Sequence, residues 1–195
     1  MNTKIYFTTL LLLFTLVSCK KENTLAEYKF ADKPIALPCD NLNIKLYNEA
    51  LYSFENDISN FYSVDKKSLL RSYSQFLNAS RFNRVDFKKM VSEHTLQVFE
   101  ALKNDQDLWS LSNTTSKLNY NSPLMDCISK NMDSNHLKTT LNALLTTNSM
   151  SAKLFTPTIL SNSGLVLRDK VLATYVAFDL YYANLFDIDF SETNP

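Results

Sequence analysis

The chain has 195 residues, of which 45% are hydrophobic, and its 20 basic side chains balance its 20 acidic ones. This length and composition fit one folded domain and argue against a disordered chain, while zero net charge gives no long-range attraction to nucleic acid. The single glycine, Gly164, excludes most nucleotide-binding proteins, whose phosphate loops need several glycines.

The N-terminal residues have the pattern of a secretory signal peptide. Lys4 supplies a positive charge, and the apolar run that follows, from Ile5 to Val17, ends before Lys20. A membrane-spanning helix needs roughly 20 apolar residues, so this run is too short to span a bilayer. We therefore predict a cleaved signal peptide over residues 1–18.

The predicted cleavage site carries a specific motif, Leu16-Val17-Ser18-Cys19. It resembles the lipobox of bacterial lipoproteins, in which a leucine three positions before the cysteine and a small residue just before it direct a dedicated signal peptidase. The resemblance implies lipid on Cys19, and two or more acyl chains anchor a protein stably to membrane lipid. The alternative is that Cys19 is incidental and that the apolar run remains as an uncleaved anchor.

Two further cysteines, Cys39 and Cys127, would meet an oxidising compartment after export. A disulfide between them would close a loop of about 90 residues, which stabilises a fold by on the order of 4 kcal/mol in the loop-entropy model. The alternative is two separately buried thiols. Neither a CxxC motif nor a histidine cluster is present, so we expect no metal site and no cofactor.

Composition also divides the exported part of the chain. Residues 19–38 are polar and charged, contain Pro34 and Pro38, and are expected to form a flexible tether behind the lipidated cysteine. A helical domain is predicted over residues 39–190, followed by a short C-terminal tail at 191–195.

Apolar residues in the domain recur at three- and four-residue steps, the spacing of amphipathic helices. The predicted helices begin near Asp40, Asp65, Val85, Ser122, Asp133 and Leu165, and a less regular stretch runs from Ser151 to Leu160. The pattern therefore predicts an all-α fold, a single bundle of about six helices.

The last predicted helix, from about Leu165 to Phe186, is apolar nearly all round. Its only charges are Arg168, Asp169, Lys170 and Asp179. A helix with so little polar surface is typical of a buried position, so we expect it at the centre of the bundle.

Histidine-based sites find little support. The two histidines, His94 and His136, lie on different predicted helices. Glu93, His94 and Glu100 could supply some ligands of a carboxylate-bridged metal pair, but the Glu-x-x-His pattern of such bundles is missing. The dipeptide Ser163-Gly164 lacks the residues that flank a nucleophilic serine and is expected to begin a helix.

The C-terminal region offers two other candidate sites. Asp179, Asp187 and Asp189 could supply a carboxylate pair for glycoside chemistry, although two of them follow the predicted helix end. Tyrosines on the last helix could line a ligand pocket, although aromatic residues at helical spacing usually form core. These tyrosines are Tyr175, Tyr181 and Tyr182. We expect no catalytic residue among either group.

The low glycine content and the many Asn, Lys, Ser and Tyr residues, together with the lipobox, resemble small lipoproteins of Bacteroidota and related Gram-negative bacteria. That resemblance implies attachment to the outer membrane, with the domain facing either the periplasm or the cell surface. We expect a lipid-anchored, non-catalytic domain of the cell envelope that binds another envelope protein and no nucleic acid. The alternatives are a lipoprotein that binds a small molecule or peptide, and an enzyme of unknown class.

Overall fold

Helices account for most of the residues that the computed structural model describes, which are 25–63, 68–112 and 115–191. Within these ranges no residue belongs to a β-strand, and Trp109 and Leu118 form an isolated antiparallel bridge. The predicted all-α class is confirmed. No helix in the described ranges is both long enough and apolar enough to cross a membrane. The predicted signal peptide and Cys19 lie outside the described residues.

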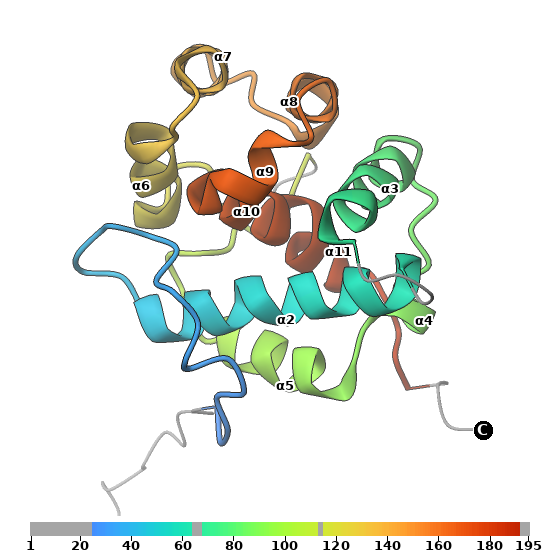
Figure 1. Cartoon of the computed structure of the whole chain (residues 1–195). Helices are drawn as coiled ribbons and strands as arrows, with labels where there is room; N and C mark the ends of the chain where they lie inside the picture. The colour runs from blue at the N-terminus through green and yellow to red at the C-terminus, as the bar shows by residue number, and fades with distance from the viewer. Residues whose placement is uncertain (1–24, 64–67, 113–114, 192–195) are drawn as a thin grey trace, which may run out of the picture.

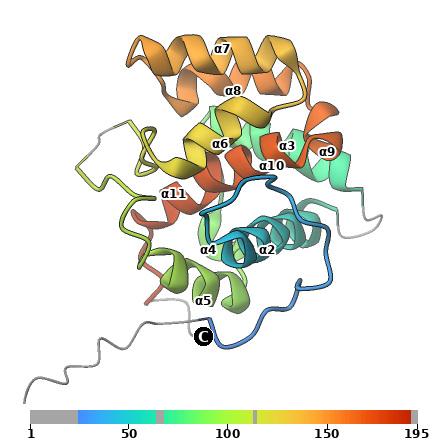
Figure 2. The ribbon, with the colours of Figure 1, turned by 90° about the vertical axis from the view of Figure 1, so that its left-hand side faces the viewer.

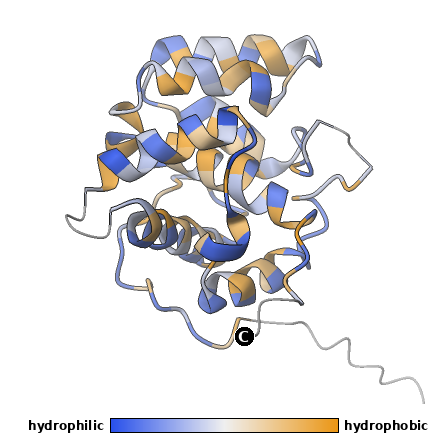
Figure 3. Ribbon diagram, turned by 90° about the vertical axis from the view of Figure 1, so that its right-hand side faces the viewer, coloured by the Kyte–Doolittle hydropathy of each residue, from blue (hydrophilic) through white to orange (hydrophobic). Residues whose placement is uncertain are grey.

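The helices are connected mostly by short loops (Figure 1). In chain order they are α2 (Ile44–Tyr62), α3 (Leu69–Arg81), α4 (Phe87–Met90), α5 (Glu93–Leu102), α6 (Pro123–Asn131), α7 (Asn135–Thr146), α8 (Ala152–Leu160), α9 (Leu165–Arg168), α10 (Lys170–Tyr175), the π-helix η2 (Val176–Tyr182) and α11 (Ala183–Leu185). In Figure 3 hydrophobic and hydrophilic residues alternate along most helices, as expected where one face is buried.

Helix starts are set by side-chain caps that differ from several predicted ones. Asn43 caps α2, Ser68 caps α3 and Ser134 caps α7, each accepting a hydrogen bond from the backbone three residues later. The aspartates that we expected to begin these helices lie one to three residues before the observed caps. The prediction missed the exact residue because Asp, Asn and Ser can all cap a helix. The predicted start of α6 at Ser122-Pro123 is correct.

Three acidic side chains of α2 are buried, and each is held by neighbouring elements. Glu55 accepts a hydrogen bond from the Tyr73 hydroxyl of α3 (2.8 Å) and pairs with Lys170 of α10 (2.6 Å). Asp57 accepts from the Tyr181 hydroxyl (2.6 Å). Glu49 accepts hydrogen bonds from the backbone of the residues that precede α2 and contacts His94 of α5. Because a buried charge is costly unless donors surround it, these contacts fix which elements pack on α2.

Residues 25–43, here called the strap, lie along α2 (Figure 2). Leu25, Ala36 and Leu37 are buried, and the backbone N–H groups of Lys29 and Phe30 donate to the two oxygens of Glu49 at 2.7 and 3.0 Å. The expected flexible tether over residues 19–38 is therefore wrong for residues 25–38, which are held as part of the domain. The prediction failed because polar residues can serve as ordered covering as well as linker.

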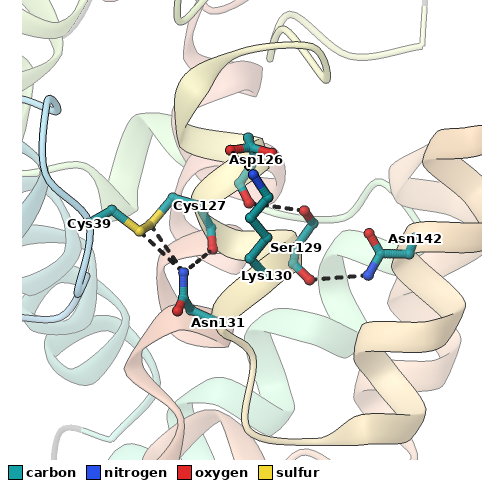
Figure 4. Close-up of polar contacts among 7 residues, drawn as sticks. All are labelled: Cys39, Asp126, Cys127, Ser129, Lys130, Asn131 and Asn142. Carbon is teal, nitrogen blue, oxygen red and sulfur yellow. Dashed lines mark hydrogen bonds and ion pairs between the residues drawn. A yellow bond between two sulfur atoms is a disulfide. The ribbon is translucent and has the colours of Figure 1, made fainter.

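Cys39 of the strap and Cys127 of α6 form a disulfide, with their Cα atoms 6.1 Å apart (Figure 4). The side-chain amide of Asn131 donates to the Cys127 carbonyl at 2.9 Å and lies 3.3 Å from the Cys39 sulfur. The structure thus pairs the two cysteines that the sequence analysis considered as a pair, and the bond ties the strap to a second part of the fold.

The C-terminal segment, here meaning α10, η2 and α11, lies between α2 and α5 on one side and α6, α7 and α8 on the other (Figures 1 and 2). All residues from Val171 to Ala183 are buried. The prediction of one continuous helix from Leu165 is wrong, because the helix is interrupted at Asp169, whose backbone is extended. The Asp169 carboxylate caps α10 through Leu172 N–H (3.0 Å) and also accepts from Asp133 N–H (2.8 Å).

Replacing Asp57 by alanine should destabilise the domain. The change leaves the buried Tyr181 hydroxyl and the Ser92 N–H, which donates to Asp57 at 3.0 Å, without their acceptor. We expect the free energy of unfolding to fall by about 2–4 kcal/mol, measured by urea unfolding followed by circular dichroism.

The matched control is Asp126→Ala on α6. Asp126 pairs with Lys130 at 2.7 Å in an exposed i,i+4 arrangement, so its loss should change the free energy of unfolding by less than about 0.5 kcal/mol. Equal effects of the two substitutions would show that the Asp57 contacts do not organise the core.

Candidate functional site

A cleft of about 730 Å³ lies beside the C-terminal segment. Its walls come from four places: the end of α3 and the residues after it, the first turns of α8, residues 115–117, and the run from Asp179 to Ile188. Elements that are far apart in sequence therefore share one hollow. Its volume falls within the range of roughly 300–1,000 Å³ that is common for ligand sites.

The cleft has both basic and apolar surface. Arg81, Lys117 and Lys153 contribute three positive charges from three different elements. Phe82 also lines the cleft and is 56% exposed, with the guanidinium groups of Arg81 and Arg84 each 5.4 Å from its ring centroid. An exposed phenylalanine between two arginines is a surface suited to an apolar group that also carries negative charge.

A buried carboxylate, Asp179 of η2, forms part of the cleft wall and is 1% exposed. Three hydroxyls donate to it: Ser116 to Oδ1 (2.6 Å), Tyr175 to Oδ2 (2.6 Å), and Tyr120 to both oxygens (3.1 and 3.2 Å). Through Ser116 and Tyr120 it anchors the segment after α5 to the C-terminal segment. Turns of π-helix are frequent at functional sites.

Burial raises the pKa of Asp179 above its usual range, and the three hydroxyl donors oppose that rise. Burial and the neighbouring carboxylate raise the pKa of both Tyr120 and Tyr175, so these hydroxyls stay protonated and keep donating. Because its oxygens already accept several internal hydrogen bonds, Asp179 is placed to hold the wall together. The arrangement does not offer a free acid or base to a ligand.

The carboxylates proposed for glycoside chemistry are only partly brought together. Asp179 and Asp187 line the same cleft, whereas Asp189 does not. Asp187 and Asp189 are exposed, and Asp189 accepts a hydrogen bond from the nearby Ser191 N–H at 2.9 Å. The structure therefore brings two of the three candidate carboxylates to one cleft. One of them, Asp179, already accepts hydrogen bonds from three hydroxyls.

The histidine-based metal hypothesis is not supported. His94 is buried, and its Nε2 atom lies 2.6 Å from Oε1 of Glu49, a residue that the sequence analysis did not consider. His136 is exposed on α7. No group of three or more potential metal-binding side chains occurs within residues 25–63, 68–112 and 115–191.

The tyrosines of the last helix pack in the core and do not line the cleft. The hydroxyls of Tyr175 and Tyr181 donate to Asp179 and Asp57, and that of Tyr182 donates to the Ala50 carbonyl at 3.0 Å. The hypothesis that they line a ligand pocket is wrong. Ser163 and Gly164 directly precede α9, as expected for a helix start, but no side chain there caps the helix with a hydrogen bond.

A second, smaller cavity of about 400 Å³ adjoins the segment that Asp179 anchors. Thr115 lines both cavities, and Tyr120 lines the smaller one. None of the residues lining this smaller cavity is charged, and most carry amide or hydroxyl groups. The sequence analysis missed both cavities because their walls come from separate loops and helix ends that share no motif.

The chain has no match among family models, curated proteins or solved structures.

Replacing Asp179 by asparagine should change how stability depends on pH. Because the folded protein has a raised pKa at Asp179 while the unfolded chain is near 3.8, the carboxyl group favours folding most in its protonated form. That contribution is complete below about pH 4 and is lost as the pH rises through the folded pKa.

The measurement is urea unfolding of both proteins at a series of pH values from about 3.5 to 8. The free energy of unfolding of wild type should fall relative to that of the asparagine variant as the pH rises. The contributions of all other carboxylates to the pH dependence cancel between the two proteins. A difference that stays constant over this pH range would contradict the assigned direction.

Proposed function

We propose that this chain is a lipid-anchored, non-catalytic interaction protein of the bacterial cell envelope, which binds a partner protein through the cleft. The observation that carries the proposal is the cleft's surface. Phe82 in its wall and Leu154, next to the cleft residue Lys153, are 56% and 55% exposed, and the guanidinium groups of Arg81 and Arg84 lie 5.4 Å from the Phe82 ring centroid. Exposed apolar side chains of this size, gathered at a hollow, are typical of interaction sites.

The anchor is supported by the sequence motif that ends at Cys19. The Cys39–Cys127 disulfide adds support, because disulfides persist in exported proteins and are rare in the reducing cytosol. By the resemblance to Bacteroidota lipoproteins, we propose the outer membrane as the site of attachment. Membrane lipid and one envelope protein are then the expected partners.

The proposal extends to the finer architecture of the domain. The complete burial of residues 171–183, and their contacts with α2 and α6, support a single helical bundle with the C-terminal segment at its centre. A partner would then bind to a wall that is backed by rigid core. Such a wall needs little reordering on binding, which favours affinity.

A catalytic role has less support from the cleft. Its buried carboxylate is held by three hydroxyls, and the imidazole of His94 lies outside the cleft, against Glu49. The second candidate function is binding of a small molecule, which the cavity volume of about 730 Å³ favours. The exposed Leu154 favours the protein partner, because this side chain does not line the cavity and a small ligand there would leave it uncovered.

Cys19→Ala should abolish lipidation and leave unprocessed precursor in the producing bacterium. Incorporation of an alkyne-labelled palmitate, followed by gel detection, measures this directly. The control is the double variant Cys39→Ser/Cys127→Ser, which lacks the disulfide cysteines and should still incorporate the label. Labelled Cys19→Ala protein would overturn the proposed anchor.

A photo-crosslinking amino acid, p-benzoylphenylalanine, at Phe82 or Leu154 should capture a defined partner in intact cells. The same residue placed at Gln97, which is exposed on α5 away from the cleft, is the control. We expect the same higher-mass adduct from Phe82 in the cleft and from Leu154 beside it, and none from the control. Equal adducts from all three positions, or none from Phe82 and Leu154, would contradict an interaction site there.

A further inference from the structure

Residues 115–121 contribute to the walls of both the cleft and the smaller cavity. Thr115 lines both of them, and Tyr120, which lines the smaller cavity, bonds through its hydroxyl to Asp179 in the cleft wall. An occupant that follows the surface past this segment would therefore contact both hollows. Their different chemistry indicates what such an occupant carries at each end.

The smaller cavity presents neutral groups that both donate and accept hydrogen bonds. Its side chains include Asn119, Asn121, Asn148, Ser110, Ser149 and Ser151. Asn119 is used internally, donating to the Asp107 carbonyl and accepting from Asn121 N–H. Asn121 and Asn148 are exposed, and no side-chain hydrogen bond of theirs is seen with the described residues.

The loop that carries Asn148 is held in place before any ligand binds. Asn148 has a positive φ of 50°, and the N–H groups of Asn148 and Ser149 donate to the carbonyls of Leu145 and Leu144 at 3.0 Å each, closing the end of α7. The backbone is thus ordered where the Asn148 side chain begins, and that side-chain amide matches a peptide group, since each has one carbonyl acceptor and N–H donors.

The cleft presents the opposite character. Its three basic side chains exceed its two acidic ones, Asp179 and Asp187, and Asp179 is covered by hydroxyls. Arg84, stacked on the exposed Phe82 ring, adds a fourth positive charge at the edge. The charge that complements this surface is negative, and the exposed Phe82 ring offers contact area to an apolar side chain.

We propose that the occupant is an extended acidic peptide segment of the partner protein. Its acidic and apolar side chains enter the cleft, and its backbone lies against the amide groups of the smaller cavity. This inference rests on the proposed function and adds the chemical class of the ligand. A neutral saccharide would use the amide groups but would leave the positive charges of the cleft uncompensated.

The test is selection of a phage-displayed library of random 12-residue peptides on the full lipidated protein in detergent. We expect enriched peptides that combine Asp or Glu with Leu, Ile or Phe. A synthetic copy of an enriched peptide, followed by fluorescence anisotropy, should bind the Arg81→Glu/Lys153→Glu variant at least about 10-fold more weakly than wild type. Asn148→Ala should weaken binding of several enriched peptides by a similar factor.

The matched control is Lys29→Glu/Lys130→Glu, which makes the same change of charge at exposed positions outside both cavities. It should bind the peptide within about 2-fold of wild type, and all variants should keep the wild-type unfolding midpoint. Enrichment of neutral or basic peptides, no enrichment at all, or equal weakening by the control would overturn the inference.

The two proposals can fail separately. Crosslinking of a partner at Phe82 without any enrichment of acidic peptides would reject the acidic segment and leave the interaction function standing. Enrichment of acidic peptides whose binding is unaffected by Arg81→Glu/Lys153→Glu would place their site outside the cleft and reject the inference.

Discussion

Three carboxylates on α2 must each find donors outside their own helix, and this requirement shapes the fold. Glu49 is satisfied by the strap and by His94 of α5, Glu55 by α3 and α10, and Asp57 by the start of α5 and by η2. A buried carboxylate without such partners would cost several kcal/mol. Packing any of these elements elsewhere would therefore lower the free energy of unfolding by about that amount. Hydrophobic burial drives these helices together, while the acids select the arrangement in which they meet.

The same principle operates at the cleft through Asp179. Its hydroxyl donors come from residue 116, from Tyr120 and from Tyr175 one helical turn earlier. These bonds hold residues 115–121, which help to line both hollows, against η2. The π-helix η2 coincides with these bonds. Asp179, Tyr181 and Tyr182, which all belong to it, each form hydrogen bonds inside the protein.

The sequence was sufficient for the all-α class, the start of α6, and the pairing considered for Cys39 and Cys127, because caps, periodicity and cysteine count are local or countable signals. It was insufficient for the acids of α2, since a helical pattern treats Glu49 and Asp57 as solvent-facing. The partner of Asp57, Tyr181, is 124 residues away, and no local signal reports such a contact. The basic residues of the cleft come from three elements with no shared motif, so only the folded chain brings them together.

The ordered strap has a consequence for how the domain would stand on a membrane. Cys19 and Leu25 are only six positions apart, so even a fully extended chain between them reaches about 20 Å. With lipid on Cys19, as proposed, the domain could not drift far from the head groups. The strap side would turn toward the bilayer, and α3 and α4, on the opposite side in Figure 1, would point outward, leaving the hollow beside them open to approaching molecules.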